Sequence, residues 1–253
     1  ALFPEMYRSL EERARVSVYR QIGAVVGLLL ALGGTPLIVQ QLSGRFGTFG
    51  GWSFTAAGIA IVAWAGFWIS LAGSREHPYG QQEDSLPLGP ALKATFGNRA
   101  FLAAAVAMLA VYVIWGWLSA MGAFFNKHVL GAAESRMSYL FLTMFGVAIV
   151  FYPLWQRFTL RFGAKRALVL SVALFAILTL GSLFAADFLH GILMFAALGA
   201  ANSGITLVHE IVLSDVIDAD ELATGVRRAG MYFGVMNFVE RLSLVVISGA
   251  TAL

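Results

Sequence analysis

Residues 100–125 read AFLAAAVAMLAVYVIWGWLSAMGAFF, an apolar run without a charged side chain. A helix needs about 20 mostly apolar residues to cross a bilayer, so this run is long enough to span one. It lacks the two-residue alternation of membrane β-strands. Because a backbone inside lipid must satisfy its own hydrogen bonds, the run predicts a transmembrane helix.

Six further stretches have the same apolar character and reach, or nearly reach, the length of a span. They cover residues 16–42, 52–74, 137–158, 167–188, 191–213 and 231–253. The composition agrees, with 59% hydrophobic residues, 12% charged residues and a mean hydropathy of +0.78. A soluble domain carries about twice that charged fraction. We therefore predict an all-α, polytopic transmembrane helical bundle with seven spans, of which residues 100–125 form the third.

The basic residues predict which side of the membrane each loop faces. Thirteen of the 17 Lys and Arg residues lie before the first span or in the loops after the second, fourth and sixth. Three lie on the other side, and Arg241 falls within the seventh span. Because cytoplasmic loops carry an excess of Lys and Arg, we expect a cytoplasmic N-terminus. The expected location is the bacterial inner (plasma) membrane.

The longest loop is the expected boundary between two helical bundles. HPYG at 77–80 and LPLGP at 86–90 interrupt helices there. The predicted organisation is residues 1–74 as the end of an N-terminal bundle with two spans, 75–99 as a central cytoplasmic loop, and 100–253 as an incomplete C-terminal bundle with five spans. The chain does not open with Met and ends in an apolar run, so we expect a truncated chain. A complete seven-helix receptor or sensor is the alternative.

Several classes of function lack their sequence signals. The net charge is +3, but the basic residues form no stripe, which argues against a nucleic-acid partner. The chain has no cysteine and no His cluster with metal-ligand spacing, so we expect no metal and no cofactor. No phosphate-binding loop and no convincing Ser-His-Asp order is present, so we expect that the protein is not an enzyme.

Four stretches carry a resemblance to a known family. They are ALFPEM at 1–6 with EERAR at 11–15 and YR at 19–20, AFFNKHVLG at 123–131, RFGAKR at 161–166, and DVIDADEL at 215–222 with TGVRR at 224–228. Together they resemble the major facilitator superfamily and, within it, the glycoside–pentoside–hexuronide cation symporters, the group of the melibiose permease. The order and spacing agree along essentially the whole chain. The resemblance implies helices five to eleven of a twelve-helix transporter.

The resemblance also implies an activity, with some departures from the family pattern. It implies a cation-coupled symporter of a small polar solute, such as a glycoside or another sugar, that works by alternating access; lysolipids and other solutes are open alternatives. The family's cation-binding carboxylates lie mainly in helices two and four, so the site for the coupling cation, Na⁺ or H⁺, is expected mostly outside this chain. Leu160 replaces an expected acidic residue, and Arg241 stands where the family has Lys. The expected partners are the solute and the lipid bilayer, with a monomer when complete.

Polar and aromatic side chains inside the spans are the candidate cavity residues. An ionisable group at the bilayer centre costs about 2.5 kcal/mol or more, so such groups face inward and mark pathways. The candidates are Tyr112, Trp115, Lys127, Asn202, His209, Glu210, Asn237 and Arg241. Glu210 and Arg241 are expected to pair, either as a substrate or gating pair or as a static ion pair. Tyr112 and Trp115 either stack on a sugar or pack against neighbours.

Charges at the cytoplasmic ends of the spans are the candidate gate. Asp215 and Asp218 are three residues apart and share a helix face, with Arg227 and Arg228 across a short turn. The pattern predicts charge pairs that break when the cavity opens inward, or alternatively an ordinary solvated loop. The other gate candidates are Arg13 and Arg20 in the first half, and Arg161, Gly163, Lys165 and Arg166 in a basic turn.

Glycines in two places have predicted structural roles. Gly199 and Gly204 lie among small residues in the sixth span, which predicts close helix packing. Gly163 in the basic turn can adopt a positive φ that other residues resist. The close packing and the turn both determine how two helices contact each other, so either could change when one helix moves against another.

Overall fold

The computed structural model describes residues 6–7, 9–31, 35–73, 88–131, 136–226 and 228–251. These residues are almost entirely helical and include no strand, which confirms the predicted all-α class. Within them, six helices are long and apolar enough to cross a membrane. Many of their large apolar side chains are exposed, as expected of a surface that faces lipid.

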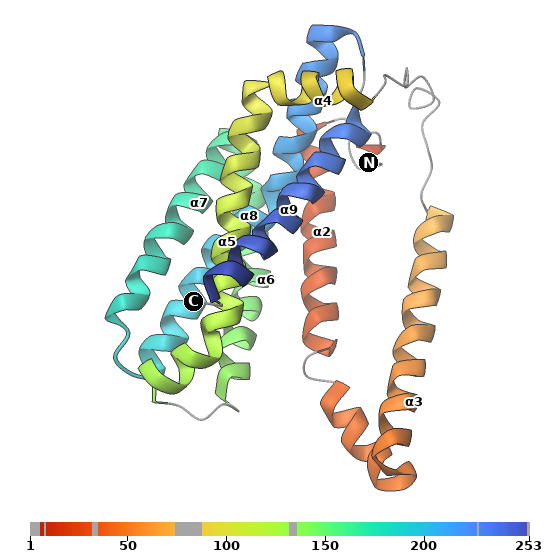
Figure 1. Cartoon of the computed structure of the whole chain (residues 1–253), viewed down its shortest axis with the longest axis vertical. Coiled ribbons are helices and arrows are strands. Elements are labelled where there is room, and N and C mark those ends of the chain that lie inside the picture. The colour runs from red at the N-terminus through yellow and green to blue at the C-terminus, as the bar shows by residue number, and fades with distance from the viewer. Residues whose placement is uncertain are drawn as a thin grey trace.

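The helices follow one another around a tall bundle, and α5 to α9 alternate in direction (Figure 1). In chain order they are α2 (Leu10–Leu29), α3 (Thr35–Gly73), α4 (Leu88–Gly97), α5 (Arg99–Phe124), α6 (Met137–Phe162), α7 (Ala164–Gly181), α8 (Phe188–Thr224) and α9 (Ala229–Thr251). A π-helix, η3 (Phe125–Val129), follows α5, and a 3-10 helix, η5 (Ser182–Phe184), follows α7.

The last five predicted spans correspond to α5 to α9. The sixth was predicted at 191–213, but α8 continues to Thr224. The predicted run ends just before the acidic cluster of Asp215, Asp218, Asp220 and Glu221, whereas the helix continues through this cluster, because an α-helix does not need apolar residues to continue. Part of the predicted loop 75–99 is also helical. This part is α4, which lies across the end of the bundle (Figure 1). Residues 75–87 of that loop lie outside the described residues.

The predicted single helix at 16–42 is wrong. Helix α2 ends at Leu29 and α3 begins at Thr35. The intervening sequence has Gly33 and Gly34, which are poor helix formers, and Pro36 follows, a residue favoured in the first turn of a helix. Helix α2 itself is not among the six candidate spans, because its first half carries acidic and basic side chains.

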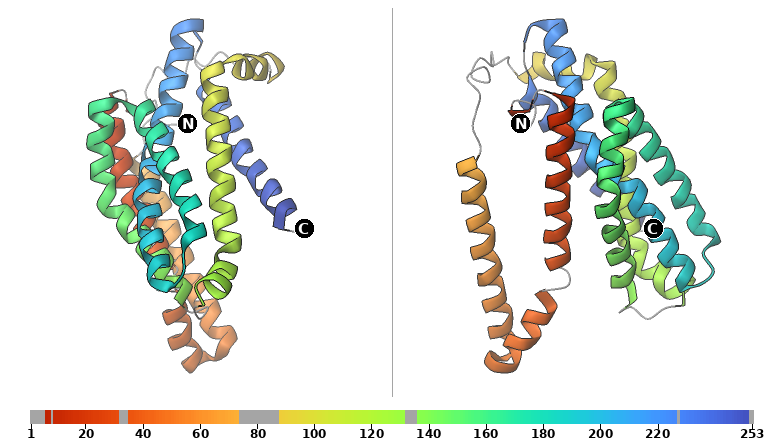
Figure 2. Two further views of the ribbon diagram at one scale, coloured as in Figure 1. Left: turned by 90° about the vertical axis from the view of Figure 1, so that its left-hand side faces the viewer. Right: turned by 180° about the vertical axis from the view of Figure 1, so that it is seen from behind.

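Helix α3 bends sharply at Gly47. The backbone there has φ 74° and ψ 169°, a conformation that is open to glycine and strained for other residues. The chain then runs back, and most of α3 stands apart from the other helices in Figure 1 and in the right-hand view of Figure 2. Its apolar side chains therefore point mostly outward, and only 6% of its most apolar window is buried.

Helix α8 forms the centre of the packed core. It lies against α6, α7 and α2, and 61% of its most apolar window is buried. A Cβ on Gly199 would lie 2.1 Å from the Met144 carbonyl oxygen, and one on Gly204 would lie 2.6 Å from the Trp155 ring. These contacts confirm the close helix packing predicted from the two glycines. They also fix α8 firmly in the bundle, and α8 carries many of the candidate site residues.

Candidate functional site

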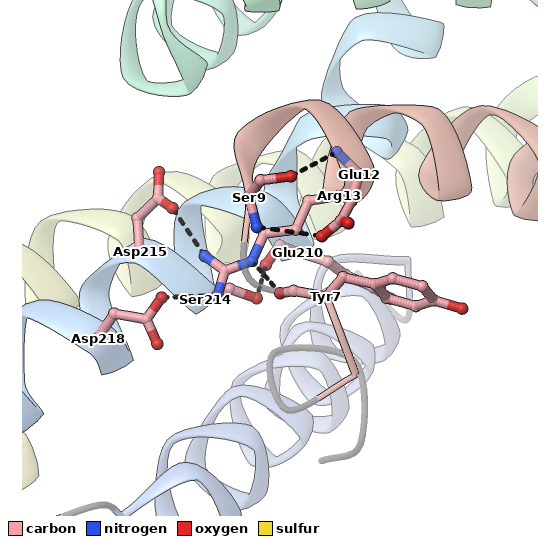
Figure 3. A network of polar contacts seen from close by, with 8 residues as sticks. All are labelled: Tyr7, Ser9, Glu12, Arg13, Glu210, Ser214, Asp215 and Asp218. Carbon is pink, nitrogen blue, oxygen red and sulfur yellow. Dashed lines mark hydrogen bonds and ion pairs between the residues drawn. The ribbon is translucent and has the colours of Figure 1, made fainter. Parts of the chain in front are cut away.

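An ion pair network joins α2 to α8 near one end of the bundle (Figure 3). Arg13 Nη1 lies 3.1 Å from Asp215 Oδ1, and Arg13 Nη2 lies 2.6 Å from Asp218 Oδ2. Arg13 Nε also donates a hydrogen bond of 2.8 Å to the Tyr7 carbonyl oxygen. Only 4% of the Arg13 side chain is exposed. One buried guanidinium therefore donates to three acceptors, two carboxylates and one carbonyl oxygen.

Local structure on both helices positions this network. Ser9 caps α2: its hydroxyl accepts the Glu12 backbone N–H at 3.1 Å, and the Glu12 carboxylate accepts the Ser9 backbone N–H at 3.4 Å. This capping box places Arg13 in the first turn of the helix. Asp215 and Asp218, three residues apart on α8, present their carboxylates side by side. The Ser-x-x-Glu pattern of Ser9 and Glu12 is visible in the sequence and is a signal for the start of this helix.

The cations opposite Asp215 and Asp218 differ from those expected. Arg228 pairs with Asp220 instead, with Arg228 Nη2 3.0 Å from Asp220 Oδ2, and also donates to Thr224 Oγ1 at 3.0 Å. Gly225 adopts φ 72° and ends α8, so the chain folds back and brings Arg228 alongside Asp220. Arg227 lies outside the described residues. Among the described residues, Asp215 and Asp218 thus pair with Arg13 in the first half of the chain, while Arg228 pairs with Asp220.

The basic turn separates α6 from α7. Gly163 has φ 88°, as predicted for this position, and its N–H donates to the Thr159 carbonyl oxygen at 2.8 Å. Arg161 lies over the Phe162 ring, 5.2 Å from its centroid. Lys165 and Arg166 are exposed. The turn therefore leaves its two later cations available to solvent or to lipid headgroups.

A cavity of about 950 Å³ lies between α5, α7 and α8 close to this end. Most of its lining consists of alanine and other apolar side chains. Lys165, Asp215 and Asp220 contribute the charged part of its wall. Asp215 therefore belongs both to the Arg13 network and to the wall of this cavity.

A second ion pair joins α2 and α8 further along both helices. Arg20 lies seven residues after Arg13, which is about 10 Å along an α-helix. Its Nη2 lies 2.6 Å from Glu210 Oε1, and its Nη1 contacts Glu210 Oε2, so the pair is bidentate. The pairing follows from the antiparallel course of the two helices, in which later residues of α2 meet earlier residues of α8.

The expected pairing of Glu210 with Arg241 is therefore wrong. Arg20 takes both carboxylate oxygens of Glu210. Helix α9, which carries Arg241, packs mainly against α5, and the Arg241 side chain is exposed. Arg20 had been expected with the gate residues, but it lies two turns further along α2, and its side chain is 48% exposed. Its partner could not be read from the sequence, because it depends on where α2 packs against α8.

Hydrogen bonds around Thr206 extend from the Arg20–Glu210 pair. Gln21 Nε2 donates to the Thr206 carbonyl oxygen at 2.8 Å, and His209 Nδ1 lies 3.0 Å from the same oxygen. The Tyr152 hydroxyl lies 3.2 Å from Thr206 Oγ1. Thr206 thus connects α2, α6 and α8. Gln21, Tyr152 and Thr206 were not singled out from the sequence, where they are ordinary polar residues within spans.

Two predicted cavity residues, Trp115 and Asn202, meet directly. Trp115 Nε1 donates a hydrogen bond of 2.6 Å to Asn202 Oδ1, and Asn202 is only 3% exposed. The Trp115 ring also stacks on Phe145, with centroids 6.0 Å apart and 28° between the planes. One turn earlier on α5 lies Tyr112, on whose hydroxyl both Glu210 and Glu240 act electrostatically.

We call this group of interacting side chains the central polar layer. It consists of Arg20, Gln21, Tyr112, Trp115, Tyr152, Asn202, Thr206, His209, Glu210 and Glu240. Its members come from α2, α5, α6, α8 and α9. Chemically, it offers charged, amide and hydroxyl groups for hydrogen bonding together with the aromatic rings of Tyr112, Trp115 and Tyr152.

Three predicted cavity residues do not join this layer: Arg241, described above, Asn237 and Lys127. Asn237 was expected to be buried but is exposed, because α9 packs through Tyr232, Val235 and Met236. Each residue advances about 100° around a helix, which turns Asn237 away from that packed face. Lys127 is exposed in η3, beyond the end of α5. Within the described ranges, His, Asp and Glu side chains form no group of three that could hold a metal ion.

Comparison with known proteins gives a consistent result. The family described as MFS/sugar transport protein matches residues 1–253. A protein named "Uncharacterized symporter" from Synechocystis sp. is 26% identical over 85% of this chain and 42% of its own length. The chain spans about half the length of the curated relatives that it matches.

Two relatives from Escherichia coli K12 have names that include a solute. One, "Putative 2,3-dihydroxypropane-1-sulfonate exporter", is 25% identical over 96% of this chain and 53% of its own length. The other, "Putative sulfoquinovose importer", is 22% identical over 96% of this chain and 52% of its own length. The names of these relatives therefore include both directions of transport.

Proposed function

The chain belongs to the MFS/sugar transport protein family, and from this premise we propose that it works as a cation-coupled secondary transporter of a small polar solute by alternating access. The family is one of transporters, which favours this function over the seven-helix receptor considered above. We further propose the organisation predicted from the sequence, with residues 1–74 and 100–253 in two bundles joined by the loop at 75–99.

The observation that carries the proposal is the central polar layer. Charged and hydrogen-bonding groups are costly inside apolar helices and are retained where something polar must bind or pass. Here Arg20 and Glu210 connect α2 to α8, while Trp115 and Asn202 connect α5 to α8. Aromatic rings beside amide and charged groups suit a hydroxylated solute. We propose that Tyr112, Trp115 and Asn202 of this layer contribute to the solute site.

The Arg13 network supports a gate at the same interface. In the proposed organisation, Arg13 belongs to the first bundle and its partners Asp215 and Asp218 to the second. Opening the solute pathway on this side would require the three side chains to separate. We propose that this network closes the cytoplasmic end of the pathway, which places the N-terminus in the cytoplasm.

The solute class follows from the relatives and from the charges. Two relatives are named for hydroxylated sulfonates, so we propose a sugar or a sugar-derived solute, with or without an anionic group. Arg241 is an exposed cation beside Glu240 on α9, and we retain it as a candidate for binding the solute. Na⁺ and H⁺ both remain candidate coupling ions. We propose a bacterial inner membrane location and a monomeric protein.

The proposal is tested by counterflow in proteoliposomes that contain the complete protein. Unlabelled solute is loaded inside, and entry of labelled sugars or hydroxylated sulfonates is measured with Na⁺, Li⁺ or pH varied. We expect exchange of at least one solute and acceleration by one cation. Absence of exchange for every sugar and sulfonate, in protein that is folded and inserted, would overturn the proposal.

A further inference from the structure

His209 lies directly beside the ion pair that joins α2 and α8. Its Nε2 is 3.9 Å from Glu210 Oε1, and this is the same oxygen that accepts the 2.6 Å hydrogen bond from Arg20 Nη2. The imidazole and the guanidinium are therefore placed on one carboxylate oxygen. The His209 side chain is 24% exposed, so water and protons can reach it.

The other ring nitrogen determines which form of neutral His209 fits this geometry. Nδ1 lies 3.0 Å from the Thr206 carbonyl oxygen, and a carbonyl oxygen can only accept a hydrogen bond. Nδ1 must therefore carry the proton. In the neutral ring Nε2 then has a lone pair and no proton, and it is this lone pair that is nearest to Glu210.

We propose that His209 is a proton-binding site whose protonation releases Arg20 from Glu210. A proton from solution binds to Nε2, and no other bond to hydrogen changes. The imidazolium then places a positive charge beside Glu210 Oε1, where it competes with Arg20 for that oxygen. The bidentate contact between α2 and α8 weakens, and it reforms when the proton leaves Nε2.

This inference rests on the proposed transport function and gives it a coupling ion. If α2 and α8 belong to bundles that separate during transport, loss of the Arg20–Glu210 contact favours separation. A proton taken up at His209 on one side of the membrane and released on the other would then accompany the solute. The proton site lies within this chain, in contrast to the sequence-based expectation that the cation site is mostly outside it.

Other polar groups surround the pair and belong to the same electrostatic environment. Arg20 approaches from α2, Tyr112 from α5 and Tyr152 from α6, while Glu240 lies on α9. The two tyrosines are hydroxyl groups that stay neutral near pH 7, and Glu240 acts on Tyr112. Glu210 and Arg20 are thus the charges in direct reach of His209 among the described residues.

The first experiment compares wild-type protein with His209→Gln in proteoliposomes. When one proton moves with one solute, a pH difference of one unit supports up to about tenfold accumulation of solute. We expect wild-type protein to accumulate solute in response to such a gradient. His209→Gln should keep counterflow, which needs no net proton movement, and lose the accumulation. His190→Gln, an exposed histidine at the start of α8, is the matched control and should behave as wild type.

Counterflow separates failure of this inference from failure of the proposed function. If wild-type protein exchanges solute but His209→Gln accumulates it normally under a pH gradient, the proton site is elsewhere. If wild-type accumulation depends only on Na⁺ and not on the pH gradient, the inference is also wrong. If wild-type protein exchanges no solute, the transport proposal itself fails.

A second measurement does not depend on the solute. The chain has no cysteine, so Arg15→Cys and Ala219→Cys can carry spin labels on exposed positions of α2 and α8. We expect the distribution of distances between the labels to shift between about pH 5 and pH 8, the range in which histidine usually titrates. His209→Gln should abolish the shift, and His190→Gln should retain it. A shift that persists in His209→Gln, or no shift in the wild-type background, would contradict the inference.

Discussion

Arg13 and Asp218 lie 205 residues apart in the sequence and meet through an Nη2–Oδ2 distance of 2.6 Å. The contact brings the start of α2 to the end of α8 (Figure 3). The Arg13 side chain is almost completely buried, whereas the Asp218 side chain is 36% exposed. Because a buried guanidinium without its carboxylates is costly, this pair holds the two helices together at one end of the bundle.

Neutralising Asp215 and Asp218 together should favour separation of α2 from α8. Hydrogen bonds to a charged group contribute about 1.5–3 kcal/mol, and partial exposure of both carboxylates reduces that value. We expect Asp215→Asn with Asp218→Asn to raise the accessibility of cysteines placed in the pathway to a cytoplasmic reagent. Glu11→Gln, which removes an exposed pair with Arg15, is the control. Unchanged accessibility in the double variant would contradict the gate.

Replacement of Arg241 should separate transport from folding. In the complete protein we expect Arg241→Ala to abolish coupled uptake while the protein stays in the membrane, since the side chain is exposed and buries little surface. Arg241→Lys keeps the charge and should retain part of the activity. Arg157→Ala, another exposed arginine, is the control. Normal uptake by Arg241→Ala would remove this residue from the proposed site.

Loss of the Trp115 donor should destabilise the core around Asn202. Trp115→Phe removes the Nε1–H group and leaves a buried amide oxygen without that hydrogen bond, at a cost of about 1–3 kcal/mol. We expect a lower melting temperature in detergent and a changed apparent affinity in counterflow. Trp117 is 43% exposed, so Trp117→Phe should change neither. Equal melting of both variants would mean that the hydrogen bond does not stabilise the protein.

A methyl group at Gly199 should disturb the contact between α6 and α8. The added Cβ would lie 2.1 Å from the Met144 carbonyl oxygen, so the two backbones must move apart. Overpacking of this kind costs about 1–3 kcal/mol or more. Gly199→Ala should therefore reduce thermal stability. Gly146→Ala adds the same group where no atom lies within 4 Å, and it should be neutral or stabilising.

The start of α8 should depend on the ionisation of Asp187. The His190 backbone N–H donates to Asp187 Oδ1 at 2.8 Å, and this bond holds the pKa of Asp187 below its usual value of 3.8. A lowered pKa means that the stabilisation is fully present above 3.8 and is lost as pH falls through the lowered value. Hydrogen exchange at the His190 amide should therefore become less protected at low pH. Asp187→Asn keeps an acceptor that does not titrate, and its protection should not follow this pH dependence.

The apolar runs allowed most helices to be predicted. Helices α5 to α9 correspond to uninterrupted stretches, so length and hydropathy were sufficient. The break between α2 and α3 was missed because residues 30–42 remain apolar on both sides of Gly33 and Gly34. The extension of α8 to Thr224 was missed because the prediction ended where the acidic residues begin. In both places the helix ends were predicted from the ends of the apolar run. The length of an apolar run indicates contact with lipid, whereas the end of a helix depends on backbone geometry.

The site was only partly predictable. Glu210, His209, Asn202, Trp115 and Tyr112 were selected because polar and aromatic groups within spans are unusual, and they do come together. Asn237 was selected for the same reason and is exposed, since a single residue does not indicate which way its helix is turned. The partners of the charges were also missed, as Arg13 and Arg20 took the positions expected of Arg228 and Arg241.

The sequence by itself determined that this chain is a helical membrane protein with a few polar groups inside its apolar segments, because transfer of side chains between water and lipid depends on residue type alone. Only the tertiary structure decided which of those groups meet. Pairing between α2 and α8 depends on the rotation and the antiparallel register of two helices about 190 residues apart. That arrangement arises from packing at contacts such as Gly199 with Met144, which no local pattern of charges encodes.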